Sequence, residues 1–342
     1  MLNKSVVTIK DVARHAGVAI STVSRVANNL NRVSEDTRKR VLNSLRELNY
    51  TPNLNAKTLK ARKSLAIGFI CEDIASPFIP EVIRGVEERA RESRYSTIIC
   101  NGNWNHKTTL YQLDMLMHRN VEGIIYSTPL RIETPLIDRL KELREKIPLV
   151  LLSEDNLEDG FHRVNIDVEQ GMAAIMDHLF SLGHERISMI AGPEDSGLNA
   201  MKIDNYKRFM ENRGHSRHIC YIHTGYSIKQ SIPVVQRLLE TPKRPTAIIG
   251  AADLAVVGGI KAAHEIGLHV PKDVSFVGWG GIDIGLYTEP AITTVLIPRY
   301  QMGRNSMTIL LECIENASVC VDLNSKDMDV VLEVRGSSGP AR

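Results

Sequence analysis

Hydrophobic residues near the start of the chain recur at helical spacing in three short segments. Thr8 is placed to cap the first helix, with Asp11 as its reciprocal partner. Gly17 follows at a sharp turn, a second helix is expected from Ile20 to Asn28, and Ser34 opens a third. The three apolar faces consist of Ile9, Val12 and Ala13, then Val18, Val23 and Val26, and finally Val41, Leu42, Leu45 and Leu48. The pattern predicts a three-helix module too small to be an enzyme.

The first two helices have the pattern of a helix-turn-helix, whose second helix lies in the DNA major groove. A small helical hairpin without such a role is the alternative. Because the valines face inward, Arg25 is free to read a guanine, Ile20 to meet a thymine methyl group and Ser21 to bond several bases. Side chains suited to phosphate contacts, which position without specifying, are Thr8, Thr22, Ser24, Asn28 and Thr37.

The distribution of charge favours the DNA-binding interpretation. Residues 1–63 contain 13 lysines and arginines against four acidic residues, a net charge of +9, and the remainder carries −7, which together give the overall +2. A basic segment is often only a solvated surface. Here it coincides with a motif that reads a groove, which indicates a polyanion bound by one end of the molecule.

Beyond residue 64 the pattern changes to short apolar runs that alternate with longer amphipathic segments. Strands are expected at Leu65–Ile70, Ser96–Cys100, Gly123–Ser127, Leu149–Leu152, Ile187–Ala191, Cys220–His223, Ala247–Gly250, Val274–Val277, Thr293–Ile297 and Val330–Val334. Helices are expected at 78–94, 110–119, 136–145, 171–182, 205–212, 232–239 and 254–266. This alternation predicts parallel sheets. About 280 residues exceed one comfortable core, so two lobes with a ligand cleft at the strand ends are expected.

The sequence motifs resemble those of the lactose/galactose repressor family. The resemblance rests on the clusters Asp-Val-Ala, Ala-Gly-Val and Thr-Val-Ser-Arg-Val, followed by Leu-Asn-Tyr-x-Pro-Asn, and extends to about Arg335. It implies a helix-turn-helix head on a two-lobed α/β core like that of periplasmic binding proteins. One departure is Ala19, where the family usually has serine. An alanine cap is weaker by about 1 kcal/mol, so capping of a shortened helix by Ser21 is the alternative.

The resemblance also implies a hinge helix between head and core, which Pro52 is placed to start. A helix of two turns is unstable alone, so it would form with DNA and a symmetry mate. In the family, two hinge helices of a dimer enter the minor groove, where a leucine wedges a base step open. Leu59 stands at that position. The other expected hinge contacts are Asn53, Ala56, Lys57 and Lys60.

Strand ends and family positions together select the residues of an effector site in the cleft. The first lobe offers Ser76, Pro77, Phe78 and Ser153, and the second offers Lys202, Tyr226, Asp253, Trp279 and Asp283. The aromatic side chains would form apolar walls for a sugar or base face, with packing inside a lobe as the alternative. Asp253 follows a strand, where a carboxylate is expected to face solvent or a ligand.

Departures from the family pattern bear on the chemistry of the effector. Lys202 replaces an arginine, Ala252-Asp253 replaces an Asn-Asp pair, and Gly280 and Ser153 stand where aspartates are typical. Two acceptor carboxylates are lost while a cation is kept, which favours an anionic effector such as a sugar acid or sugar phosphate. A degraded pocket with a protein co-effector is the alternative.

Catalytic and metal motifs are not evident. The chain lacks a Gly-x-Ser-x-Gly elbow, a phosphate-binding Gly-x-x-x-x-Gly-Lys loop and His-Glu-x-x-His. A zinc site from His215, His218, Cys220 and His223 is disfavoured, because alternation would send Cys220 and His223 to opposite faces of a strand. Five cysteines without paired spacing fit reduced thiols in the cytoplasm. No signal peptide or membrane-spanning run is expected.

The sequence therefore predicts a DNA-binding regulator that is not an enzyme and uses no cofactor. We expect it to bind a palindromic operator as a homodimer and to respond to a small effector in carbohydrate metabolism. A sugar-binding transport protein is a less favoured alternative. The expected domains are the head at 1–51, the hinge at 52–63, a first lobe at 64–164 and 297–325, and a second lobe at 165–296 and 326–342.

Overall fold

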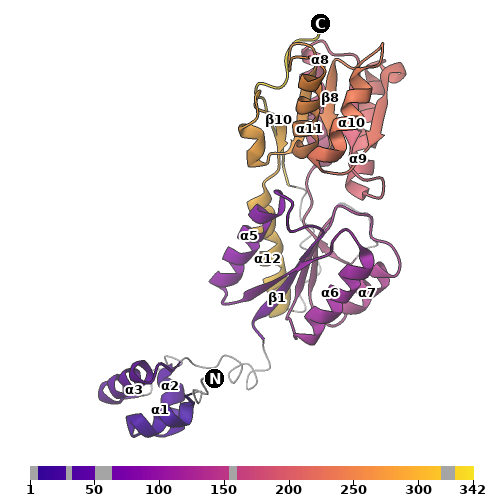
Figure 1. Ribbon diagram of the computed structural model, residues 1–342. Helices are drawn as coiled ribbons and strands as arrows, with labels where there is room; N and C mark the ends of the chain where they lie inside the picture. The colour runs from indigo at the N-terminus through magenta and orange to yellow at the C-terminus, as the bar shows by residue number, and fades with distance from the viewer. Residues whose placement is uncertain (1–6, 28–32, 51–63, 154–159, 317–327) are drawn as a thin grey trace, which may run out of the picture. The chain divides into compact units, whose positions relative to one another are not determined.

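The computed structural model describes residues 7–27, 33–50, 64–153, 160–316 and 328–342. The chain forms two units, a head (Met1–Ser64) and a core (Leu65–Arg342). Figure 1 shows the head as a cluster of helices and the core as two α/β lobes. No helix in these ranges has the length and apolar character needed to cross a bilayer.

The head contains α1 (Ile9–Ala16), α2 (Ile20–Ala27) and α3 (Glu35–Glu47). Its buried core is made of side chains from all three helices, namely Val12, Ala13, Ala16, Val23, Val26 and Val41. All of these except Ala16 are inward positions that the helical spacing predicts, and the predicted Ile9, Val18, Leu45 and Leu48 pack against them half-buried. The three helices that the sequence pattern predicts are therefore confirmed, with α2 described as far as Ala27.

One predicted position in the third helix is wrong. Leu42 was expected in the apolar stripe of α3, but its side chain is 37% exposed. Ser44 is buried instead, where its hydroxyl donates to the carbonyl oxygen of Arg40 at 2.9 Å and lies 3.0 Å from Nδ1 of His15. A serine fits this buried position because both of these polar contacts satisfy its hydroxyl group.

The first lobe of the core is built on a five-stranded parallel sheet with the strand order β2-β1-β3-β4-β5. Its strands are β1 (Ala66–Cys71), β2 (Ser96–Asn101), β3 (Ile124–Ser127), β4 (Leu149–Leu152) and β5 (His162–Arg163). The helices are α5 (Ile79–Glu92), α6 (His106–His118) and α7 (Leu136–Arg144). Figure 1 shows α6 and α7 on one side of the sheet and α5 with α12 (Arg299–Glu315) on the other.

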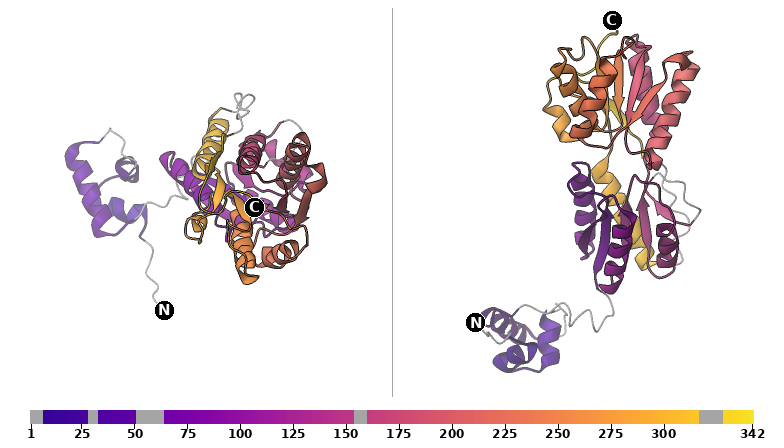
Figure 2. Two further views of the ribbon diagram at one scale, coloured as in Figure 1. Left: turned by 90° about the horizontal axis from the view of Figure 1, so that it is seen from above. Right: turned by 45° about the vertical axis from the view of Figure 1, so that its right-hand side comes forward.

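The second lobe contains a six-stranded sheet with the order β11-β10-β9-β8-β6-β7. Its strands are β6 (Ile187–Ala191), β7 (Cys220–His223), β8 (Ala247–Gly250), β9 (Ser275–Gly280), β10 (Thr293–Leu296) and β11 (Val331–Glu333), and only β11 runs antiparallel to its neighbour. The helices are α8 (Val168–Ser181), α9 (Gly197–Asn212), α10 (Ile228–Leu239) and α11 (Asp253–Glu265), with short 3-10 turns at Ser216–His218 and Asp283–Leu286. Figure 2 shows the two lobes joined by narrow connections.

The sequence pattern did not predict α12, which follows the last parallel strand and packs on α5 of the first lobe. Two glycines let the helices approach closely. A side chain at Gly85 would clash with the carbonyl oxygen of Tyr300, and one at Gly303 would clash with that of Val82. The chain therefore enters the second lobe, returns to the first through α12 and ends in the second with β11.

Candidate functional site

The outer face of α2 presents the side chains that the sequence selects for reading DNA bases. Ile20 is 44% exposed, although it is apolar, and Ser21 and Arg25 are exposed beside it. Thr22 and Ser24 are half-buried at the edges of this face. Because Val23 and Val26 hold the opposite face in the core, these positions cannot turn inward without unpacking the head.

The turn between α1 and α2 depends on Gly17, which adopts a left-handed conformation with φ of 63°. Such a residue commonly ends a helix, and glycine adopts it without steric strain. The N–H group of the following Val18 donates to the carbonyl oxygen of Ala13 at 3.1 Å, which closes the end of α1. This turn fixes the angle at which α2 leaves α1.

The alternative that Ser21 caps a shortened second helix is wrong. The helix begins at Ile20, and the carbonyl oxygen of Ala19 accepts from the N–H groups of Thr22 and Val23 at 2.9 and 3.2 Å. Ala19 is therefore the residue before the first turn, and Ser21 lies inside that turn with its side chain exposed. The hydroxyl group of Ser21 is consequently available on the base-reading face.

The start of α1 is fixed by the predicted reciprocal cap. Asp11 Oδ2 accepts from the backbone N–H of Thr8 at 3.0 Å and from its hydroxyl at 2.7 Å. These bonds to the charged form lower the pKa of the Asp11 carboxyl. The hydroxyl of Thr37 accepts from that of Ser34 at 2.9 Å, and the phosphate contacts expected of Thr8 and Thr37 stay predictions. The remaining predicted DNA contacts lie outside the described residues: Asn28, Asn53, Ala56, Lys57, Leu59 and Lys60.

In the first lobe of the core, the predicted effector residues lie at the ends of β1 and β4. Ser76 and Phe78 belong to the loop between β1 and α5, where the Ser76 hydroxyl accepts from the N–H of Phe78 at 3.4 Å. Both are half-buried, whereas Ser153, directly after β4, is 1% exposed. Of the predicted residues of this lobe, the two serines and Phe78 are therefore half-buried or buried at these strand ends.

In the second lobe, Lys202 and Trp279 form a buried pair. The ammonium group of Lys202 lies 4.3 Å from the centre of the Trp279 ring and donates to the carbonyl oxygen of Ala251 at 3.0 Å. Lys202 is 1% and Trp279 4% exposed. An ammonium group over an indole face is stabilised by the ring quadrupole. The cation that the sequence assigns to the effector site is thus held inside the lobe.

Tyr226 is half-buried and is held by two residues that sequence reasoning missed. Its hydroxyl accepts from the amide of Asn199 at 2.7 Å and lies 3.3 Å from the hydroxyl of Ser196. Both are buried at the start of α9, where Ser196 is the N-cap residue and Asn199 lies in the first turn. The predicted helix at 205–212 began too late to include them.

The expectation that Asp253 must face solvent or a ligand is wrong. This carboxylate is 1% exposed and accepts from the hydroxyl of Thr294 at 2.5 Å and from the N–H of Ile282 at 2.8 Å. Burial raises its pKa, and these hydrogen bonds oppose that rise. Internal donors satisfy the carboxylate where the sequence argument assumed that only water or a ligand would.

Asp283 is largely exposed and pairs with Arg299, a residue that sequence reasoning also missed. The Arg299 guanidinium lies 3.7 Å from Asp283 and donates to the carbonyl oxygens of Gly281 at 2.9 Å and Pro77 at 3.2 Å. It therefore joins the loop after β9 in the second lobe to the loop after β1 in the first. Its position directly after the last parallel strand is the signal that the strand-end rule could have used.

The structure brings several of the predicted residues together around Gly280. A side-chain carbon placed there would lie 3.6 Å from Asp253 Oδ2 and 4.0 Å from the Phe78 ring. The adjacent Trp279 covers Lys202. The position where the family typically has an aspartate is therefore at the boundary between the two lobes, beside an existing buried carboxylate.

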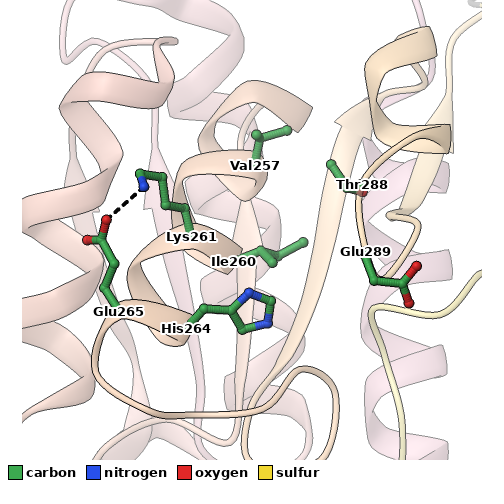
Figure 3. A pocket seen from close by; sticks show the side chains of 7 residues that line it. All are labelled: Val257, Ile260, Lys261, His264, Glu265, Thr288 and Glu289. Atoms are coloured by element: carbon green, nitrogen blue, oxygen red, sulfur yellow. Dashed lines mark ion pairs between the residues drawn. The ribbon is translucent and has the colours of Figure 1, made fainter.

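A surface hollow with a volume of about 430 Å³ lies away from these predicted effector residues. It lies on α11 and is lined by Val257, Ile260, Lys261, His264 and Glu265, and by Thr288 and Glu289 opposite. Figure 3 shows Lys261 paired with Glu265, at 2.8 Å, on one side of the hollow. None of the predicted effector residues lines it.

The histidine-rich run does not gather into a metal site. His223 Nδ1 lies 3.0 Å from the carbonyl oxygen of Gly192, and the rings of His215 and His218 are 6.4 Å apart. Within the part of the chain that the structure describes, no group of three or more His, Cys, Asp or Glu side chains could hold a metal ion.

Comparison with known proteins covers both units. Residues 8–53 match the bacterial regulatory proteins of the lacI family, and residues 176–335 match a periplasmic binding protein-like domain. Catabolite control protein A of Priestia megaterium is 33% identical over 92% of this chain and 94% of that protein. The transcriptional repressor CytR of Escherichia coli K12 is 32% identical over 97% of this chain and 96% of that one.

Solved structures give the same result. A lac repressor dimer bound to operator and an anti-inducer superimposes with a TM-score of 0.87 at 25% identity, over 97% of this chain and 99% of the other. A regulator of Enterococcus faecium with bound ribose gives 0.72 at 25% identity, over 81% of this chain and all of the other. These relatives are regulators and not enzymes. The chain, with its helix-turn-helix head and two-lobed parallel α/β core, belongs to the LacI family of DNA-binding transcriptional regulators.

Proposed function

We propose that this repressor binds a palindromic operator as a homodimer and that a small effector in the inter-lobe cleft changes its DNA affinity. The observation that carries the proposal is the outer face of α2, where Ile20, Ser21 and Arg25 are exposed together on a helix anchored by buried valines. Two copies related by a twofold axis would place this face in successive major grooves, which makes a palindrome the expected site.

Selection from random duplex DNA with the full chain tests this proposal. The expected product is a pair of inverted half-sites, with affinity that falls steeply as salt is raised because counterions are released from phosphates. Enrichment of a single, non-repeated site would contradict a symmetric dimer. Absence of any enriched sequence would contradict specific reading by α2.

We propose further that the effector is an anionic sugar derivative. Support comes from Lys202, a basic side chain buried beside Trp279 in the second lobe, and from Ser153 and Gly280, which are neutral where the family typically has carboxylates. The relative with bound ribose supports a sugar as the ligand class. An operator-binding regulator of sugar or sugar-acid utilisation would act in the cytoplasm, where the DNA is.

Calorimetric titration with glucose and with glucose 6-phosphate separates the two classes of sugar. Binding of the phosphate alone, weakened in Lys202→Gln, supports an anionic effector. Tight binding of glucose that Lys202→Gln leaves unchanged would contradict it.

The alternative is a cleft that no longer binds a ligand, in a repressor that is controlled by a protein co-effector. The internal hydrogen-bond partners of Asp253 and Tyr226 favour this alternative.

The proposed division of the chain is a head at 1–51, a hinge at 52–63, a first lobe at 64–164 with 297–325 and a second lobe at 165–296 with 326–342. The two sheets and the packing of α12 on α5 support it. In this arrangement an effector that favours one lobe angle would shift DNA affinity by roughly 1–3 kcal/mol, the usual size of allosteric coupling.

A further inference from the structure

The loop between β2 and α6 holds a tryptophan in an unusual backbone conformation. Asn103 and Trp104 are consecutive residues with φ of 57° and 53°, in the left-handed region that side chains other than glycine seldom adopt. A bulky residue in this conformation is strained and persists only where the surrounding structure holds it there. Residues in such strained conformations are often found at binding sites and at switch regions.

Neighbouring groups keep Trp104 in place. Its backbone N–H donates to the carbonyl oxygen of Glu72, directly after β1, at 3.3 Å. The next residue, Asn105, caps α6 by accepting from the N–H groups of Lys107 and Thr108 at 2.9 and 3.2 Å. The loop is therefore fixed at both sides of the tryptophan, and the indole is not free to move away with a flexible backbone.

The ring that this loop presents contacts the other lobe. Trp104 is 39% exposed, and its ring centre lies 5.8 Å from that of Tyr226 with the planes tilted by 34°. Aromatic pairs at this separation stabilise a contact beyond the area they bury. Trp104 follows β2 in the first lobe and Tyr226 follows β7 in the second, so the pair spans the cleft.

Tyr226 is fixed as firmly as its partner. Asn199 and Ser196 hold its hydroxyl, and Ser196 also donates to the carbonyl oxygen of Pro129 in the first lobe at 2.7 Å. A backbone bond from the N–H of Arg131 to the carbonyl oxygen of Asp195, at 2.8 Å, lies beside it. The ring and the hydroxyl of Tyr226 are thus each connected to the first lobe, one directly and one through Ser196.

We propose that the contact between Trp104 and Tyr226 is an aromatic latch that sets the closed arrangement of the two lobes and controls operator affinity. Trp104 becomes a first-lobe wall of the effector site that the sequence did not select. A ligand that presents a flat apolar face to either ring would compete with the latch and release the lobes. The proposal rests on the proposed function, because operator affinity is the property that the latch controls.

A double-mutant cycle in the full chain tests the latch through operator affinity at fixed salt. Trp104→Ala and Tyr226→Ala are each expected to change affinity roughly two- to tenfold in the same direction, the range for one aromatic pair. The double variant should change it no further, since either truncation alone opens the latch. Additive effects, or unchanged affinity in the single variants, would overturn the proposal.

Two exposed tyrosines serve as matched controls. Tyr111 on α6 is 61% exposed in the first lobe, and Tyr221 on β7 is 37% exposed in the second. Their alanine variants are expected to leave operator affinity unchanged, because Tyr111 is exposed on α6 and the Tyr221 ring contacts His223 and Lys207 of its own lobe. A shift as large as that of Tyr226→Ala would attribute the effect to general loosening of a lobe and overturn the latch.

A DNA-independent measurement separates failure of the latch from failure of the proposed function. The chain has two tryptophans, so the fluorescence of Trp104 is obtained by subtracting the emission of Trp104→Phe from that of the unsubstituted chain. Acrylamide should quench this emission more strongly in Tyr226→Ala, because loss of the phenol uncovers the indole. Unchanged quenching would show that the rings are not stacked in solution. If the unsubstituted chain binds no operator but quenching still increases in Tyr226→Ala, the result contradicts the proposed function of the head and supports the contact between the two rings.

Discussion

The head and the core differ in the exposure of their predicted functional residues. In the head, Ile20, Ser21 and Arg25 are exposed on a helix whose other face is packed. In the core, Lys202 and Asp253 are almost fully buried and already have internal partners. The outer face of α2 leaves its side chains exposed, whereas Lys202 and Asp253 are bound by other groups of their own lobe, namely Ala251 and Trp279 for the first and Ile282 and Thr294 for the second. Substitutions in the two regions should therefore affect different properties.

The largest effect is expected from Asp253→Ala, which should lower stability. The substitution leaves the buried N–H of Ile282 and hydroxyl of Thr294 without their acceptor, at a cost of about 3 kcal/mol. Urea unfolding monitored on the core measures it, with Asp253→Asn as the isosteric control that retains one acceptor. A variant with unchanged stability and a lost effector response would instead make Asp253 a ligand contact and weaken the contrast between the regions.

Arg25→Ala is the counterpart in the head and should leave stability unchanged. We expect operator binding to weaken by about 1–3 kcal/mol, with relaxed preference at one base position. Arg46→Ala, which removes another exposed arginine from the last turn of α3, is the matched control and should retain sequence preference. Competition binding against single-base operator variants measures both. An equal loss of affinity for all sequences would make Arg25 a phosphate contact.

The sequence predicts the head well because its periodicity is undisturbed. Valines at helical spacing identify the buried face, and what remains on α2 must be outward. The error at Leu42 arose because a serine whose hydroxyl is bound by His15 and Arg40 can replace an apolar residue in the core. Apolar spacing cannot reveal a buried polar pair, since the partner lies 29 positions away in the sequence.

In the core the same reasoning locates strands well and helices less well. The strands at 149–152, 187–191, 220–223 and 247–250 are predicted to the residue. The start of α9 was missed because Asn199 and Lys202 are buried polar residues that break the apolar pattern. The helix α12 was missed because Gly303, Ser306 and several apolar residues are buried around much of its circumference, so no amphipathic stripe appears.

The strand-end rule finds the neighbourhood of the cleft but not the state of each side chain. It selected Tyr226, which follows β7, and Asp253, which follows β8, and their role in binding an effector stays a prediction. It could not show that Asn199 holds one and that Thr294 holds the other, because those partners come from distant parts of the chain. Trp104 and Arg299 also follow strands, and only the folded structure shows that they reach the opposite lobe.

The smallest effect is expected from acidification, and it should be confined to the core. His184 is 2% exposed, with Nε2 2.9 Å from the carbonyl oxygen of Gly339 and Nδ1 3.0 Å from the hydroxyl of Thr246. Burial lowers its pKa below the usual 6.5, with a smaller contribution from the nearby His178. Its neutral form thus joins the C-terminal residues to β6 and β8.

The sign of the pH dependence follows from this lowered pKa. The unfolded chain takes up a proton near pH 6.5, whereas the folded core does so only at lower pH, so the unfolded state binds more protons in between. The stability that neutral His184 contributes to the core is therefore complete above pH 6.5 and falls as the pH drops below it. Urea unfolding at pH 8, 6 and 5 should show this fall, and His184→Gln should flatten it more than His178→Gln does. If the free energy of unfolding falls with pH equally steeply in His184→Gln, the titration belongs to other groups. If unfolding of the head changes as well, the effect of acid is not confined to the core.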